Sequence, residues 1–172
     1  MLAVGSLAQA WEIFFAIYIY SNYLYRPFFA DPPGVRSVAL LKPLAEQLYE
    51  LVENFAFSKL RNTFIRTILR AWHPATLTAA ASSIATLASS KLWNHLDPAE
   101  LESHPNATER ELFTAVLSLE TDKLRNRVVH KEAYRPTLAE FNHCREDEIR
   151  LLYQLKHTFH VADSEELAGD AA

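Results

Sequence analysis

The chain has 172 residues, of which 49% are hydrophobic, so it is long enough to bury a sizeable core as a single domain. Its net charge of −4 excludes a surface that binds polyanions everywhere, so any contact with nucleic acid must come from a local basic patch. A single cysteine, Cys144, excludes an internal disulfide and fits a reducing compartment, which predicts a cytoplasmic protein.

The first segment, residues 2–25, carries one charged side chain, Glu12, and its densest apolar run covers residues 11–20. Its length would allow a membrane span. Gln9 and Glu12 interrupt the run, however, and no lysine or arginine precedes Arg26, so the basic region of a signal peptide is missing. The four tyrosines in its second half also suit a protein interior better than the middle of a bilayer. We therefore predict a buried first helix and no membrane association.

A break at Asp31-Pro32-Pro33-Gly34 separates this helix from the next three. Apolar residues spaced by three and four predict helices over residues 37–55, 60–72 and 75–92, with Pro43 at a start or a kink. The third is rich in alanine, serine and threonine, which allow close packing inside a bundle. The apolar positions are Leu44, Leu48, Leu51, Val52 and Phe55; then Leu60, Phe64, Ile65, Ile68, Leu69 and Trp72; and then Leu77, Ile84 and Leu87.

Three arginines, Arg61, Arg66 and Arg70, fall between the apolar positions of the second of these helices. Such residues usually form a solvated face, and this is the interpretation that we favour. The alternative is a second surface that binds phosphate.

Capping signals mark three further helix starts. Asp97 precedes a proline and a glutamate, which predicts a short helix with an N-cap. Thr108-x-x-Glu111 is a capping box that we expect to open the helix carrying residues 123–136, and Thr137-x-x-Glu140 should open a last helix through Phe159. The residues expected to face inward on that last helix are Leu138, Phe141, Ile149, Leu152 and Leu155.

Together these patterns predict an all-α fold, a compact bundle of about five to seven helices without a sheet. Residues 1–163 are expected to form one domain. The acidic residues 164–172 are expected to form a flexible tail.

Residues 123–136 carry the densest group of functional side chains. Leu117, Leu124 and Val128 are seven and four residues apart, so they continue one apolar stripe along a helix. Pro136 ends the segment, because the residue before a proline is disfavoured in helical geometry.

Within this stretch Asn126 and His130 are four residues apart and lie on one helical face, with Arg125 next to it. A guanidinium, an amide and an imidazole are thus gathered near a helix end, which favours binding of a phosphate. Four basic residues surround them: Lys123, Arg127, Lys131 and Arg135.

Arg125-Asn126-x-x-x-His130, late in an all-helical chain, resembles the signature of the HEPN superfamily. The resemblance is specific over residues 123–136 and only architectural elsewhere. Its typical members are metal-independent ribonucleases of toxin–antitoxin, phage-defence and CRISPR systems that act as dimers. The resemblance therefore implies a homodimeric endoribonuclease without metal or cofactor, with Arg125, Asn126 and His130 as catalytic residues, RNA as substrate, and an antitoxin or regulatory protein as a further partner.

The residue types fit this chemistry. A histidine titrates near neutral pH and transfers protons, whereas an arginine stays charged and offers a planar fork of donors to a phosphate. One copy of the motif supplies a single acid–base group, and a dimer would supply two. One subtype of the family carries a modifiable tyrosine two residues after the histidine, but Glu132 occupies that position here. The alternatives are a non-catalytic HEPN module that binds a nucleotide or a partner protein, and a membrane-anchored helical protein with an accidental motif.

Overall fold

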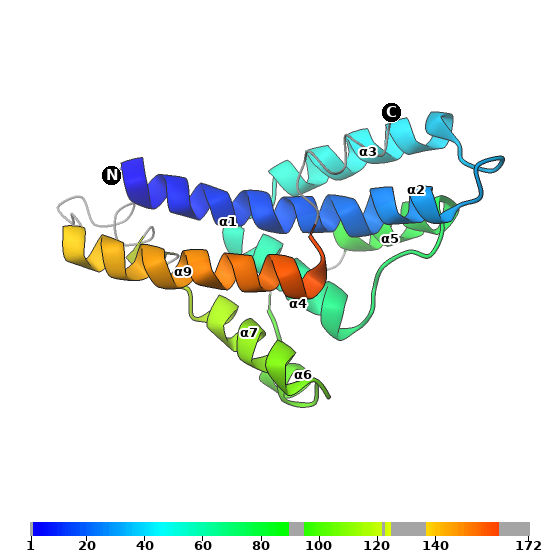
Figure 1. Ribbon diagram of the computed structural model, residues 1–172. Helices are drawn as coiled ribbons and strands as arrows, with labels where there is room; N and C mark the ends of the chain where they lie inside the picture. The colour runs from blue at the N-terminus through cyan, green and yellow to red at the C-terminus, as the bar shows by residue number, and fades with distance from the viewer. Residues whose placement is uncertain (1, 90–94, 122, 125–136, 162–172) are drawn as a thin grey trace. The chain divides into compact units, whose positions relative to one another are not determined.

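The computed structural model describes residues 2–89, 95–121, 123–124 and 137–161 (Figure 1). Over these residues the regular structure is entirely helical, which confirms the predicted all-α class. The chain divides into two units, residues 1–14 with 106–172 and residues 15–105, which are described separately below. A single domain over residues 1–163 stays a prediction, and the tail at 164–172 lies outside the described residues. The helices are α1 (Leu2–Tyr20), the π-helix η1 (Ser21–Tyr25), α2 (Arg26–Ala30), α3 (Val38–Glu53), α4 (Phe57–Leu69), α5 (Leu77–Ser89), α6 (Pro98–Glu102), α7 (Ala107–Leu117) and α9 (Leu138–Phe159).

The first helix continues without a break through α1, η1 and α2, because both junction residues, Tyr20 and Tyr25, keep right-handed helical angles. It ends at Asp31, whose extended backbone precedes a proline as expected. Trp11 and Phe15 are completely buried, which confirms the prediction of a buried first helix. Among the described residues, no helix combines the length and the apolar character needed to cross a membrane.

The core of the unit formed by residues 15–105 is aromatic. The ring of Phe64 on α4 is completely buried, with its centroid 5.3 Å from that of Phe15 and 4.7 Å from that of Tyr18. Helix α3 begins at Ser37, whose hydroxyl accepts from the amide of Leu40. Pro43 lies inside α3 and not at its start.

Helix α5 supports the same unit with one face. Its apolar stripe is spaced by three and four residues and packs against α3 and η1, whereas most of its other small side chains are exposed. Asp31 caps the helix from a distant part of the chain, because its Oδ2 accepts from the amide of Leu77 at 3.4 Å. The expected packing of this helix is thus present on one side. The buried residues of α5 are Leu77, Ala80, Ile84 and Leu87.

Helix α4 ends earlier than predicted. The spacing of apolar residues favoured a helix through Trp72, but α4 stops at Leu69, and Ala71 adopts a left-handed conformation with φ of 47°. The amide of Trp72 donates to Thr67 O at 2.9 Å, and the amide of Ala71 donates to Ile68 O at 3.1 Å. These two bonds form a Schellman motif with alanine where glycine is usual.

The expectation of a solvated arginine face is wrong for Arg66. This side chain is only 4% exposed. Its Nη2 donates to His95 O at 2.8 Å and to Glu100 Oε2 at 3.3 Å, and Arg70 pairs with the other oxygen of Glu100. Glu100 lies in the first turn of α6, so the pairing attaches α6 to α4 and withdraws Arg66 from any phosphate. The short helix itself is confirmed, because Asp97 caps it through the amide of Ala99.

In the other unit, the start of α7 differs from the prediction. Asn106 is the N-cap: its Oδ1 accepts from the amide of Glu109 at 3.2 Å, and its Nδ2 donates to Glu109 Oε1 at 2.7 Å. The same spacing occurs at Thr108 and Glu111, but the helix begins two residues earlier. It ends at Leu117, so α7 does not continue into residues 123–136 as we expected.

Helix α9 starts at Thr137 with the predicted capping box and runs through Phe159. The orientation of its buried face differs from the prediction. Leu138 was expected to face inward and is 75% exposed, whereas Leu155 is buried as expected. The ring of Phe159 stacks on that of Phe113 from α7, with centroids 5.6 Å apart. The residues of α9 that are buried are Cys144, Glu148, Leu151 and Leu155.

Candidate functional site

Most of the predicted site lies outside the described residues. This applies to the predicted catalytic residues and to three of the four predicted RNA-binding residues. The exception is Lys123, which is exposed and forms an ion pair with Glu120. The residues outside the described part are Arg125, Asn126, His130, Arg127, Lys131 and Arg135.

The residues that lead into the motif are well packed. After α7 the chain turns at Ser118, and helical geometry resumes at Glu120. Leu119, Thr121 and Leu124 are buried, while Lys123 between them points into solvent. Thr121 and Leu124 are three residues apart and so lie on one face of this new helical turn. Arg125 therefore follows directly on a turn that is anchored in the unit.

A buried carboxylate holds this turn. Glu148 on α9 is 5% exposed, and its Oε1 accepts from the backbone amide of Thr121 at 2.8 Å. Its Oε2 accepts from Trp11 Nε1 at 2.7 Å and from the hydroxyl of Thr121. The thiol of Cys144, one turn earlier on α9, donates to Oε1 at 3.3 Å. All four donors are neutral groups, so they replace the hydration of the charge without neutralising it.

The position of Glu148 also suits the start of this helical turn. The first amides of a helix lack acceptors within the helix, and a carboxylate near them is favourable for the helix dipole. Thr121 is the second residue of the turn that begins at Glu120, and its amide is directed at Glu148. Glu148 thus caps, from another helix, the turn that precedes Arg125.

Cys144 takes part in this cluster as a hydrogen-bonding group. Burial, followed by the nearby charge of Glu148, raises the pKa of the Cys144 thiol to about 11, although the hydrogen bond with Thr121 lowers it. The thiol is therefore protonated at neutral pH and is a poor nucleophile.

Sequence reasoning missed Glu148 because it ends the charged run Arg145-Glu146-Asp147-Glu148, which looks solvated. The spacing of residues on α9 did nevertheless indicate that Glu148 is buried. Cys144, Glu148, Leu151 and Leu155 are spaced by four, three and four residues, so the carboxylate lies on the apolar face of α9.

A second feature of this unit is a cavity of about 430 Å³ between α7 and α9. It brings a guanidinium, a phenol and an imidazole together from successive turns of α9. Tyr153 is 70% exposed, so its ring is available for stacking. The lining residues are Thr108, Leu112, Arg150, Tyr153, Gln154, His157 and Thr158.

No protein-family model, no curated protein and no solved structure matches this chain. The likeness to the HEPN superfamily thus depends on the residues of the Arg125–His130 motif. In fold, the chain and that superfamily share the all-α class.

Proposed function

We propose that this protein is a metal-independent endoribonuclease that cleaves RNA with Arg125, Asn126 and His130 in a homodimer. His130 is the acid–base group, because imidazole is half-protonated near neutral pH. Arg125 binds the phosphate and stabilises the charge that develops on it. Asn126 orients the imidazole. The biological role that fits this activity is that of a toxin–antitoxin or phage-defence effector, held inactive by a partner protein.

The reaction is an in-line transesterification. One His130 removes the proton from the ribose 2′-hydroxyl, and the oxygen attacks phosphorus. The bond from phosphorus to the 5′-oxygen breaks, and that oxygen takes a proton from a second histidinium. The products are a 2′,3′-cyclic phosphate and a 5′-hydroxyl, with no net change in protons. Since one chain carries one such histidine, the second comes from the other protomer across a two-fold axis.

The observation that carries the proposal is the anchoring of the turn before Arg125. A catalytic group must be held within a fraction of an ångström, and packing with supporting hydrogen bonds achieves this. Leu124 is buried directly before Arg125, and Thr121 is bonded to Glu148 through both its amide and its hydroxyl. If the motif were accidental and this were only a surface helix end, the turn before it would not need a buried carboxylate to hold it.

The cavity between α7 and α9 offers a route for the RNA strand in the same unit. Single-stranded RNA is bound by cationic side chains along the backbone and by aromatic rings under the bases. Arg150 and Tyr153 provide one of each. Such a local surface would let a chain whose net charge is −4 bind RNA.

The decisive experiment incubates purified protein with end-labelled RNA in excess EDTA. His130→Ala and Arg125→Ala should each lower the cleavage rate by about a hundred- to ten-thousand-fold, since general acid–base catalysis contributes that much. Arg125→Lys should restore little, because an ammonium lacks the bidentate geometry. Asn126→Ala should have a smaller effect.

The matched control is His143→Ala. This histidine is exposed on α9, 3.9 Å from Asp147, and its removal should leave cleavage unchanged. End-group analysis should find cyclic phosphate, and sedimentation should find a dimer at micromolar concentration. Cleavage that persists in both His130→Ala and Arg125→Ala, or activity confined to a monomer, would refute the proposal.

A further inference from the structure

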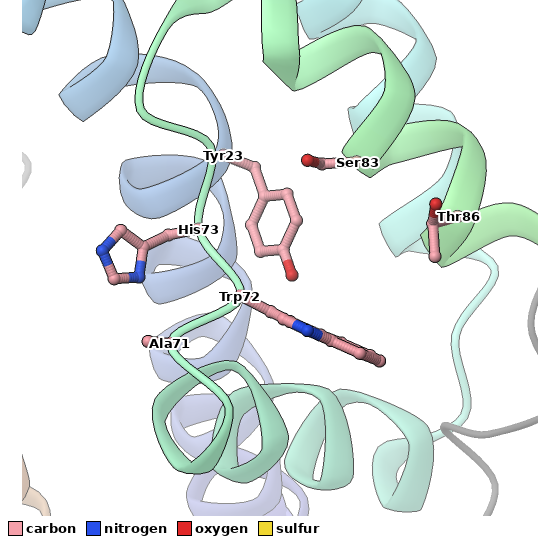
Figure 2. A pocket seen from close by; sticks show the side chains of 6 residues that line it. All are labelled: Tyr23, Ala71, Trp72, His73, Ser83 and Thr86. Atoms are coloured by element: carbon pink, nitrogen blue, oxygen red, sulfur yellow. The ribbon is translucent and has the colours of Figure 1, made fainter.

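A cavity of about 270 Å³ in the unit formed by residues 15–105 is lined by the indole of Trp72 and by three hydroxyl-bearing side chains, Tyr23, Ser83 and Thr86. It lies where η1, α5 and the turn after α4 meet. In Figure 2 the indole of Trp72 is seen edge-on, and Tyr23, Ser83 and Thr86 lie on one side of its plane. The ring of His73 points away from them. The size of the cavity suits one heterocyclic base better than a dinucleotide, because pockets for drug-sized ligands begin at about 300 Å³.

Two unusual backbone features form this cavity. Tyr23 belongs to the π-helical turn η1, and such turns occur frequently at functional sites. Ala71, before Trp72, has a φ of 47°, which is unfavourable for a residue with a Cβ. The left-handed residue turns the chain so that the Trp72 indole lies against the cavity, and the side chain remains 37% exposed. A large aromatic side chain thus remains partly exposed to solvent at the edge of the cavity.

The hydrogen bonds of Tyr23 determine which atom it offers to a ligand. The hydroxyl of Thr67 donates its only proton to Thr63 O at 2.8 Å, so in its 3.2 Å contact with Tyr23 it must accept. The phenol of Tyr23 is therefore the donor. Burial raises its pKa, opposed by the hydrogen bond with Thr67, so it keeps that proton at neutral pH. What its oxygen presents to the cavity is lone pairs.

The two hydroxyls of α5 are arranged in the same way. Ser83 donates to Ala79 O at 3.2 Å, and Thr86 donates to Ser82 O at 2.9 Å. Each hydroxyl thus donates its proton to a backbone carbonyl four residues earlier. All three hydroxyl oxygens of the lining thus act as acceptors. A ligand that satisfies them must present N–H or O–H groups.

The charge near the aromatic wall disfavours one class of donor. The guanidinium of Arg70 lies 4.7 Å from the centroid of the Trp72 ring and is paired with Glu100. Although this pairing weakens the repulsion, a second cation on the indole is still disfavoured, whereas a neutral planar ligand is not repelled. A flat indole wall favours stacking, which contributes about 1–3 kcal/mol for a nucleic-acid base.

We propose that this cavity binds a neutral planar heterocycle with an exocyclic amino group, of the adenine or cytosine type, stacked on Trp72 with its amino group donating to Tyr23. The base can belong to a free nucleoside or to a nucleotide within RNA. The binding is independent of the proposed cleavage, and it requires neither Arg125 nor His130.

Matched nucleosides test the donor argument directly. Adenosine and inosine differ by an amino group against a carbonyl, and so do cytidine and uridine. By calorimetry on the full chain, adenosine or cytidine should bind at least about tenfold more tightly than its carbonyl partner, because the carbonyl would face the acceptor oxygens. Equal affinity within both pairs would overturn the proposal, and so would the absence of binding by all four.

Substitutions test the roles of Trp72 and Tyr23 in binding. Trp72→Ala should weaken binding by about tenfold or more, whereas Trp72→Phe should retain most of the stacking. Tyr23→Phe should reduce the preference for the amino compound, and the control Tyr49→Phe should not, because the hydroxyl of Tyr49 bonds to Tyr25 and does not line the cavity. Full affinity in Trp72→Ala would contradict the assignment. If Tyr23→Phe does not fold, the nucleoside pairs still decide the question.

A last comparison separates the two sources of the base. Adenosine and a six-residue oligoadenylate are titrated against His130→Ala, in which the proposed cleavage is blocked. Tighter binding of adenosine identifies a site for a free nucleoside, and tighter binding of the oligomer identifies a site for a base within RNA. Both results support the cavity, whereas binding that is unaffected by Trp72→Ala places the ligand elsewhere and overturns it.

Discussion

Replacing Glu148 by glutamine would test the buried cluster that holds the turn before Arg125. The carboxylate has two acceptor oxygens, each directed at one rigid N–H group: the amide of Thr121 at Oε1 and the indole N–H of Trp11 at Oε2. Glutamine has nearly the same shape but only one acceptor oxygen. The substitution therefore removes hydrogen bonds without creating a cavity.

The size of the effect follows from counting donors. In either orientation of the amide, its NH₂ group faces one of the two rigid N–H donors. The hydroxyl of Thr121 and the thiol of Cys144 can rotate to accept, so they are less affected. A buried donor without a partner costs about 1–3 kcal/mol, and the bond that remains is weakened because the acceptor is no longer charged. We expect Glu148→Gln to lower the free energy of unfolding by about 2–3 kcal/mol.

The assay is urea denaturation followed by circular dichroism, with Glu146→Gln as the matched control. Glu146 lies on the same helix but is exposed, so its substitution should change the free energy of unfolding by less than about 0.5 kcal/mol. The slope of the unfolding free energy against urea should stay the same in both variants, because neither alters the surface exposed on unfolding. If Glu148→Gln unfolds at the same urea concentration as Glu146→Gln, the cluster does not stabilise the fold as we argue.

Three further predictions concern single residues. Ala71→Gly should raise the free energy of unfolding in urea by about 0.5–1 kcal/mol, because glycine adopts a φ of 47° without strain; a decrease would contradict this. Cys144, whose pKa burial raises to about 11, should react with iodoacetamide at pH 8 roughly a hundredfold more slowly in the folded than in the urea-unfolded protein, and equal rates would show that it is exposed. Burial raises the pKa of Glu100, but the hydrogen bond from Arg70 and the charge of Arg66 outweigh it and leave that pKa below its usual range. Glu100→Gln should therefore destabilise the protein by about 3 kcal/mol at pH 7. The deficit should shrink as the pH falls through and below the usual range for a glutamate, because the wild-type carboxylate then also takes up a proton, and a deficit independent of pH would disprove the pairing.

Local patterns in the sequence were sufficient to locate most of the helices, although not the ends of α4 and α7. The spacing of apolar residues predicted α3, α4 and α5, and the chain breaks before Pro32 because a residue preceding proline avoids helical geometry. The caps at Asp97 and Thr137 were predictable for the same reason, since a capping side chain bonds an amide only two or three residues away. Where two capping signals overlapped, at Asn106 and Thr108, the sequence did not distinguish them.

The predicted site likewise has a part that can be read from the sequence and a part that cannot. The grouping of Arg125, Asn126 and His130 is a property of neighbouring residues and can be read without coordinates. The burial of Glu148 cannot, because a glutamate in a charged run appears solvated until its donors are known. One of those donors, Trp11, is 137 residues away in the sequence.

Tertiary structure alone decided the remaining features. Arg66 is buried because Glu100, 34 residues later, approaches it. The phenol of Tyr23 donates its proton to Thr67, 44 residues later, because the hydroxyl of Thr67 already donates to a backbone carbonyl. The spacing of side chains along a helix follows from local geometry, but the partner of a buried polar group depends on which distant segment is packed against it. The sequence therefore determined most of the helices and the motif of this protein, and the packing of distant segments determined what holds the turn before Arg125 and what lines the cavity.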